Sequence, residues 1–187
     1  MRIGDILYFA PEIKFKDLDF DDTESIVNAF QNRINGYYLA PAVDLANHGH
    51  WFGAGVICVA AIDSLARYAY GGGVRIRIVR WLCNNIAEFR NTDPSNSDQT
   101  LAFRFYEEFR NGLVHEGRIK NGGQFSGDFD FINIIENVMI INSGHLVDRT
   151  SNGLDNYRER LLANNANREQ FLARLIEDFK IDLQKVN

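Results

Sequence analysis

Cysteine is scarce in this sequence, with two residues among 187. Two thiols exclude a disulfide framework and a thiolate-rich zinc site. Cys58 lies inside an apolar run and Cys83 follows a tryptophan and a leucine, so we expect both to be reduced core residues. Net positive charge is also lacking, because 20 Lys and Arg residues stand against 25 Asp and Glu residues, for a formal net charge of -5. A nucleic acid or an anionic membrane could therefore be bound only by a local basic patch.

Long apolar runs and targeting signals are absent as well. The longest nearly uninterrupted apolar stretch, residues 52–62, is far shorter than the roughly 20 residues that a membrane-spanning helix needs. Residues 1–5 lack the charged and then apolar pattern of a secretory signal, so we expect a cytoplasmic protein without a membrane partner. Repeats, low-complexity tracts and long linkers are missing too. Since 45% of the residues are hydrophobic, we expect one domain over residues 1–187.

Helical periodicity dominates from Asp21 onward, because apolar residues recur three and four positions apart. Asp21 and Glu24 are typical of a capping pair, and Pro41 is expected to stop or bend the first helix. The expected helices cover residues 21–41, 51–70, 74–89, 99–116, 154–162 and 168–183. The second is apolar on most sides, which predicts a place at the centre of a bundle. The predicted fold is therefore mainly all-α, an up-and-down helical bundle.

Little β-structure is expected. Residues 91–97 have the composition of a loop, in which Ser97 or Asp98 caps the next helix. Apolar runs on both sides of the Asn-Ser-Gly at residues 142–144 predict one small β-hairpin with its turn there. We expect an N-terminal arm, core helices, a glycine-rich segment with this hairpin, and C-terminal helices, over residues 1–20, 21–120, 121–150 and 151–187.

The end of the helix over 99–116 carries the most informative side chains, Arg110, Asn111 and His115, with Gly117 as terminator. Asn111 and His115 are four residues apart and so share one helix face, and Arg110 can reach them from the adjoining face. An imidazole suits proton transfer near neutral pH, and a guanidinium suits two phosphate oxygens. Alternatively, these side chains only cap carbonyls and pair with nearby carboxylates, namely Glu107, Glu108 or Glu116.

This pattern of an Arg, a polar residue, three residues and a His resembles the motif of the HEPN superfamily (higher eukaryotes and prokaryotes nucleotide-binding domains). The long apolar helix ending at residues 60–68 resembles the central helix of that fold, and helix order extends the resemblance over about residues 21–120. Many HEPN proteins are metal-independent endoribonucleases that act as toxins or defence effectors, in dimers whose two motifs face each other. The resemblance implies an RNA substrate, a homodimer, a possible antitoxin partner and no cofactor.

The same resemblance implies a role for each motif residue. His115 would act as acid or base while a ribose 2′-hydroxyl attacks the adjacent phosphate. Arg110 would stabilise the phosphorane, and Asn111 would orient His115 or the phosphate. DNA, which lacks the 2′-hydroxyl, would be inert. The alternative is a HEPN-like bundle without catalysis that binds RNA, a nucleotide or a partner protein.

Supporting roles are expected for residues around the motif. Asp63, a carboxylate within an apolar helix, either pairs with Arg67 or faces Arg110 or His115 and fixes their geometry, and Glu116 is a second supporting candidate. Nine basic and six acidic residues lie between residues 67 and 120, so the chain has a basic middle. The candidates for RNA binding are the basic residues Arg67, Arg75, Arg77, Arg80, Arg118 and Lys120.

Structural roles without catalysis or ligand binding are expected for three other features. His48 and His50 have a spacing seen in metal sites, but we expect a helix-entry loop and no metal. The glycines at residues 71–73 lack the Lys and Ser or Thr of a phosphate loop and are expected to form a turn. His145 is expected on the surface of the hairpin.

Overall fold

The computed structural model describes residues 2–183 of the chain, and side chains over residues 3–181. Helices make up most of it: α1 (Thr23–Ile34), α2 (Ala40–Asn47), α3 (Trp51–Ala69), α4 (Val74–Asn85), α5 (Leu101–Phe105), α6 (Ser143–Ala163) and α7 (Asn165–Leu183). Three small sheets accompany the helices. The predicted all-α bundle with a single β-hairpin is therefore wrong, because the fold is mainly helical but mixes α and β elements.

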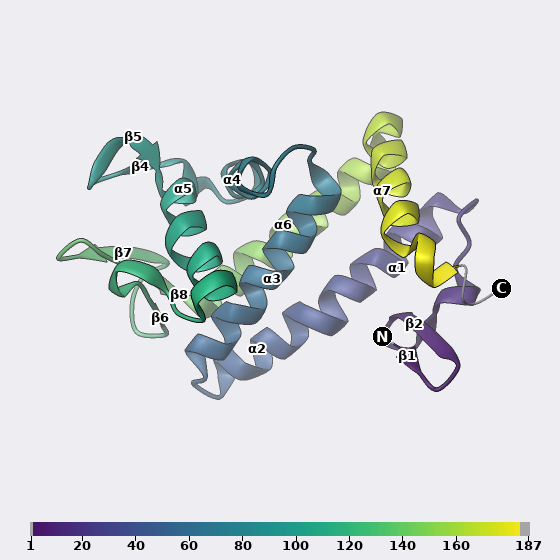
Figure 1. Ribbon diagram of the computed structural model, residues 1–187, viewed down its shortest axis with the longest axis horizontal. Coiled ribbons are helices and arrows are strands. Elements are labelled where there is room, and N and C mark those ends of the chain that lie inside the picture. The colour runs from purple at the N-terminus through teal and green to yellow at the C-terminus, as the bar shows by residue number, and fades with distance from the viewer. Residues whose placement is uncertain (1, 184–187) are drawn as a thin grey trace.

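Helix α3 is the centre of the helical part, as its apolar composition predicts (Figure 1). Helices α2, α4, α6 and α7 all pack against it. Its Cys58, Ile62 and Leu65 are fully buried, whereas Cys83 on α4 is half-buried. Within the described part of the chain, α3 alone is long and apolar enough to cross a membrane. Half of its most apolar 18-residue stretch is buried in the protein. The buried half lies against the surrounding helices.

The first sheet replaces the expected N-terminal arm. Strands β1 (Arg2–Ile3), β2 (Ile6–Ala10) and β3 (Ile13–Lys14) pair antiparallel in that order. Phe9 and Phe15 are buried, and the ring of Phe179 from α7 lies 5.5 Å and 5.1 Å from theirs. Residues 3–15 are part of the core because Phe179, 164 positions after Phe15, packs against the rings of Phe9 and Phe15.

The second sheet replaces the expected loop over residues 91–97. Strands β4 (Thr92–Asp93) and β5 (Asn96–Thr100) form a short hairpin. The cap of the following helix is Thr100, whose hydroxyl accepts a hydrogen bond from the Phe103 amide at 3.3 Å, and not Ser97 or Asp98. Pairing of β5 continues up to the helix, so the cap falls at its last residue.

The predicted hairpin with its turn at residues 142–144 does not form, and the third sheet contains a hairpin with its turn at other residues. Strands β7 (Ile132–Ile135) and β8 (Val138–Asn142) pair antiparallel, and β6 (Gln124–Ser126) runs parallel to β8 on its other edge. Glu136 and Asn137 form the turn, both with positive φ, as tight hairpin turns require. Asn142 instead caps α6 by accepting from the His145 amide at 3.1 Å. An Asn before Ser-Gly suits a cap as well as a turn, and here the cap forms.

Two helical stretches contain widened turns with hydrogen bonds five residues apart. Between α1 and α2, the π-helical η2 (Asn35–Leu39) precedes Pro41, and the Ala40 amide donates to the Asn35 carbonyl. The chain stays helical to Asn47, so Pro41 does not stop it. The expected helix over 99–116 is α5 followed by π-helical η4 (Tyr106–Arg110) and η5 (Gly112–Glu116), together called the motif helix (residues 101–116) below. It ends, as predicted, at Gly117 with φ of 67°.

Candidate active site beside the central helix

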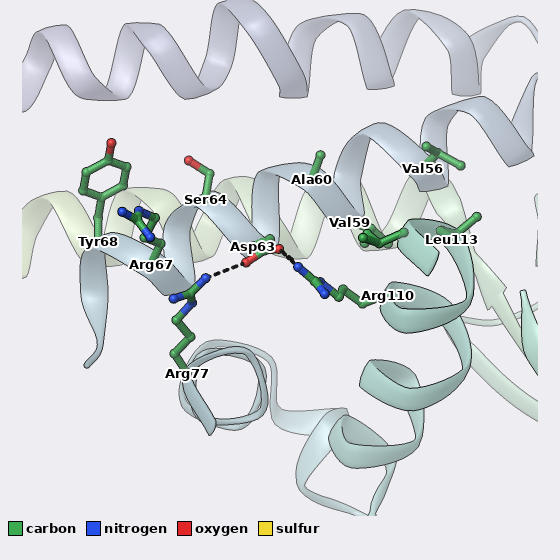
Figure 2. Close-up of a pocket in the computed structure, with 11 residues that line it drawn as sticks. Val56, Val59, Ala60, Asp63, Ser64, Arg67, Tyr68, Arg77, Arg110 and Leu113 are labelled. Atoms are coloured by element: carbon green, nitrogen blue, oxygen red, sulfur yellow. Dashed lines mark hydrogen bonds and ion pairs between the residues drawn. The ribbon is translucent and has the colours of Figure 1, made fainter. Parts of the chain in front are cut away.

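A pocket of about 460 Å³ lies between α3, α4 and the C-terminal end of the motif helix (Figure 2). We call it the arginine pocket. One end is apolar and the other carries charged and hydroxyl groups. Its walls are formed by Val56, Val59, Ala60, Asp63, Ser64, Arg67, Tyr68, Arg77, Arg110, Leu113 and Val114.

Asp63 holds two guanidinium groups in this pocket, one from each side (Figure 2). Its Oδ2 accepts hydrogen bonds from Nε and Nη2 of Arg110 at 3.1 and 2.7 Å. Its Oδ1 accepts from Nη2 of Arg77 at 3.4 Å. The three side chains are only 14–25% exposed. Two guanidiniums share one carboxylate, so this cluster carries an excess positive charge.

Of the two predictions for Asp63, the contact with Arg110 forms and the contacts with Arg67 and His115 do not. Arg67 instead pairs with Asp178 of α7, with its Nε 2.6 Å from the carboxylate. Hydrogen bonding by Arg67 lowers the pKa of Asp178, although burial of that carboxyl acts in the opposite direction. Asp63 and Asp178 thus hold the three arginine side chains that line the pocket, Arg67, Arg77 and Arg110.

The other two motif residues lie outside the pocket wall. Asn111 donates from Nδ2 to Glu107 Oε2 at 3.2 Å, one turn back along its own helix. His115 is exposed and directly follows Val114, a lining residue that is 56% exposed. Among the described residues, no hydrogen bond joins Arg110, Asn111 and His115. The widened turns of η4 and η5 still allow residues four and five apart to share a face, but Arg110 bonds Asp63 and Asn111 bonds Glu107 instead.

Glu116 does not contact the motif residues that it was expected to support. It pairs with Arg118 at 2.7 Å and with Lys120 at 3.0 Å. The hydrogen bond from Lys120 is the main cause that lowers the pKa of Glu116. Two of the predicted RNA-binding residues are therefore engaged with a carboxylate at the end of the motif helix.

The remaining predicted RNA-binding residues lie on or near α4. Arg77 lines the arginine pocket together with Arg67. Arg75 and Arg80 are exposed, and their guanidiniums lie over the rings of Phe103 at 5.6 Å and Tyr70 at 4.8 Å. Within the described residues neither has an acidic partner, so both keep their charge available to a ligand.

The arginine pocket is the first of three hollows that share lining residues. A second, of about 260 Å³, shares Arg67 and Arg77 and adds Arg174 of α7, and a third, of about 320 Å³, joins the second at Tyr70. We call the three together the groove. Sequence reasoning missed Arg174, because it lies on α7 and reaches the end of α3, where its Nη1 donates to the Arg67 carbonyl at 2.8 Å. The groove is lined by five arginines and three carboxylates: Arg67, Arg77, Arg110, Arg160, Arg174, Asp63, Glu177 and Asp178.

No group of three or more His, Cys, Asp or Glu side chains in the described part of the chain is arranged to hold a metal ion. The pair at residues 48 and 50 follows α2, where His48 Nδ1 lies 2.8 Å from the Asp44 carbonyl. The carboxylate of Asp44 also lies 3.4 Å from that nitrogen. Both histidines are exposed in a loop.

Comparison with protein-family models, with curated proteins and with solved structures found no match for this chain. Partly buried guanidiniums with excess positive charge favour an anion with several oxygens, and an exposed imidazole at the end of the same helix can exchange protons.

Proposed function

We propose that the protein is a metal-independent endoribonuclease of HEPN type that acts on RNA in the cytoplasm. The observation that supports the proposal is the position of Arg110 relative to His115. The guanidinium of Arg110 lies in a pocket that Arg77 also lines, and the exposed His115 directly follows the last lining residue, Val114. A phosphate bound by the guanidiniums would lie near the end of the helix that carries the imidazole. A role as toxin or defence effector, with an antitoxin partner, belongs to the same proposal.

The proposed reaction is cleavage by the neighbouring ribose. The 2′-oxygen forms a bond to phosphorus, and the bond from phosphorus to the 5′-oxygen of the next nucleotide breaks. His115 accepts the 2′-hydroxyl proton or donates one to the leaving 5′-oxygen. Arg110 stabilises the charge on the pentacoordinate phosphorus, and Asn111 positions His115 or the phosphate. The products are a 2′,3′-cyclic phosphate and a 5′-hydroxyl.

Asp63 tunes Arg110 in this mechanism. The carboxylate now occupies the Nε and Nη2 donors that a phosphate would use in a fork. Because Arg77 also contacts Asp63, a phosphate entering the pocket meets two guanidiniums and one carboxylate, and attraction exceeds repulsion. Asp63 therefore holds the fork in place before RNA arrives and yields part of it afterwards.

A homodimer completes the proposed site. His115 does not line the arginine pocket of its own chain, and its neighbour Val114 is an exposed apolar residue. A two-fold axis near these residues would bury Val114 and bring a second Arg110, Asn111 and His115 close to the first. Light scattering that shows a monomer at assay concentration would contradict this arrangement.

RNA recognition is expected along the groove. The protein has a formal net charge of -5, yet the groove is lined by more arginines than carboxylates. Arginines that track phosphates, with an aromatic ring for base stacking, are the usual means of binding a single strand. Tyr70 is the ring shared by two of the three hollows, and Arg80 lies over it.

The test is incubation of the purified protein with labelled RNA in excess EDTA. Cleavage should persist, DNA of the same sequence should stay intact, and His115→Ala should abolish cutting. His145→Ala, at another exposed histidine, is the matched control and should cut like the parent. Arg110→Lys keeps the charge but loses the fork, so cutting should fall sharply. Dependence on metal, or full activity of His115→Ala, would refute the mechanism.

A bundle that binds RNA without cutting it is the second candidate. The observation that favours it is the contact of Asp63 with Arg110, because a carboxylate already fills the fork that catalysis needs. In that case RNA would bind and be recovered intact, and His115→Ala would leave the affinity unchanged.

A further inference from the structure

A buried ionic cluster lies on the motif helix, outside the groove. Arg104 is 5% exposed and donates from Nε to Glu108 Oε1 at 2.9 Å and from Nη1 to Asp93 Oδ1 at 3.1 Å. Asp93 and Glu108 are 3% and 5% exposed. Burial opposes ionisation of Asp93, but hydrogen bonds from Ser95 and the contact with Arg104 outweigh it and lower the pKa of this carboxyl. One guanidinium thus faces two carboxylates, which leaves one negative charge uncompensated.

The carboxylate oxygen of this cluster that lacks a hydrogen-bond donor is Glu108 Oε2. This oxygen is buried and accepts no hydrogen bond from any described residue, whereas Oε1 accepts from both Arg104 and Asn121. Arg104 gives Oε2 no hydrogen bond, because its Nη1 donates to Asp93, Ser95 and Asn137 and its Nη2 donates to the Asn137 carbonyl. A buried carboxylate oxygen without a hydrogen-bond donor lowers the stability of the folded state. We therefore expect a donor group from outside the chain to bind this oxygen.

A pocket of about 450 Å³ lies against this cluster and shares no lining residue with the groove. We call it the acidic pocket. Four carboxylates and a single arginine are among its walls, and most other lining groups are polar. They are Asp93, Ser95, Asn96, Gln99, Phe103, Arg104, Glu107, Glu108, Asn121, Glu136, Asn137 and Val138.

The chemistry of these walls selects the ligand. Since four carboxylates face one guanidinium, the ligand must bring positive charge and N–H donors. A bare metal ion fits poorly, because no three His, Cys, Asp or Glu side chains among the described residues converge to hold one. The volume is that of a small organic molecule. We propose that the acidic pocket binds an alkyl diamine or polyamine, with one ammonium group at Glu108 and further ammonium groups at Glu107 and Glu136.

The test is calorimetric titration of the full-length protein with cadaverine at constant ionic strength, with 1,5-pentanediol as the uncharged control. Saturable one-to-one binding of the diamine and none of the diol are expected. Glu108→Gln should weaken binding at least tenfold. Glu136→Gln, at an exposed position that should leave the fold intact, should weaken it several-fold. Glu24→Gln, at a surface carboxylate of α1, should change nothing.

Three results would overturn the proposal. Cadaverine could bind no better than the diol, or bind equally to the parent, Glu108→Gln and Glu136→Gln proteins. A carboxyl carbon signal in nuclear magnetic resonance could also show Glu108 to be neutral at pH 7 in the free protein, since a proton would then be the missing donor. The ribonuclease activity does not enter this test, so either proposal can fail alone.

Discussion

Replacing Asp63 by asparagine removes the carboxylate that Arg77 and Arg110 share and leaves the size of the side chain almost unchanged. Three hydrogen bonds lose their negative acceptor, two from Arg110 and one from Arg77. Breaking a fully buried ion pair costs about 3–5 kcal/mol, whereas an exposed pair contributes about 0–1 kcal/mol. The three side chains are 14–25% exposed, so they lie between these limits. The unfolding free energy should fall by about 1–3 kcal/mol.

Urea denaturation measures this loss, and Glu24→Gln provides the control. Glu24 is 70% exposed and 3.8 Å from Arg158, so its replacement should cost less than about 0.5 kcal/mol. RNA binding should change in the opposite direction from stability. Each guanidinium freed for a phosphate should steepen the slope of log affinity against log salt by about 0.7. Weaker RNA binding by a folded Asp63→Asn protein would refute the idea that this carboxylate competes with phosphate.

Two further predictions concern the backbone of the motif helix and acid stability. A Cβ at Gly112 would clash with the Arg118 carbonyl oxygen, so Gly112→Ala should lower the unfolding free energy, measured in urea, by about 1–3 kcal/mol. Gly73 has open space around it, so the control Gly73→Ala should change the unfolding free energy by less than about 0.5 kcal/mol. Equal effects of the two would contradict the packing argument. The folded pKa of Asp178 is lowered, so its contribution to stability is present above its unfolded pKa of about 3.9 and is lost as pH falls. Asp178→Asn should therefore flatten the decline of stability below about pH 4, as acid titration can measure.

Local sequence patterns predicted the helices well and the β-structure poorly. The expected helix over 51–70 matches α3 almost to the residue, because its apolar surface and the glycines after it are local features. The hairpin turn was misplaced because Asn142 satisfies the chemistry of a turn and of a helix cap equally well. The N-terminal sheet was missed because the burial of Phe9 depends on Phe179, far away in the sequence.

The sequence by itself determined the helical periodicity, the apolar central helix and the succession of Arg110, Asn111 and His115, since each is a short-range pattern. Only the tertiary structure decided which charges meet. Asp63 has Arg67 four residues away, yet it pairs with Arg110, 47 residues further on, because the fold places the C-terminal end of the motif helix across the arginine pocket from α3. Arg67 is thereby left to Asp178, 111 residues away. Ion pairs form where packing brings charged side chains within about 4 Å of each other. Residue spacing along one helix cannot predict the distance between side chains on two different helices.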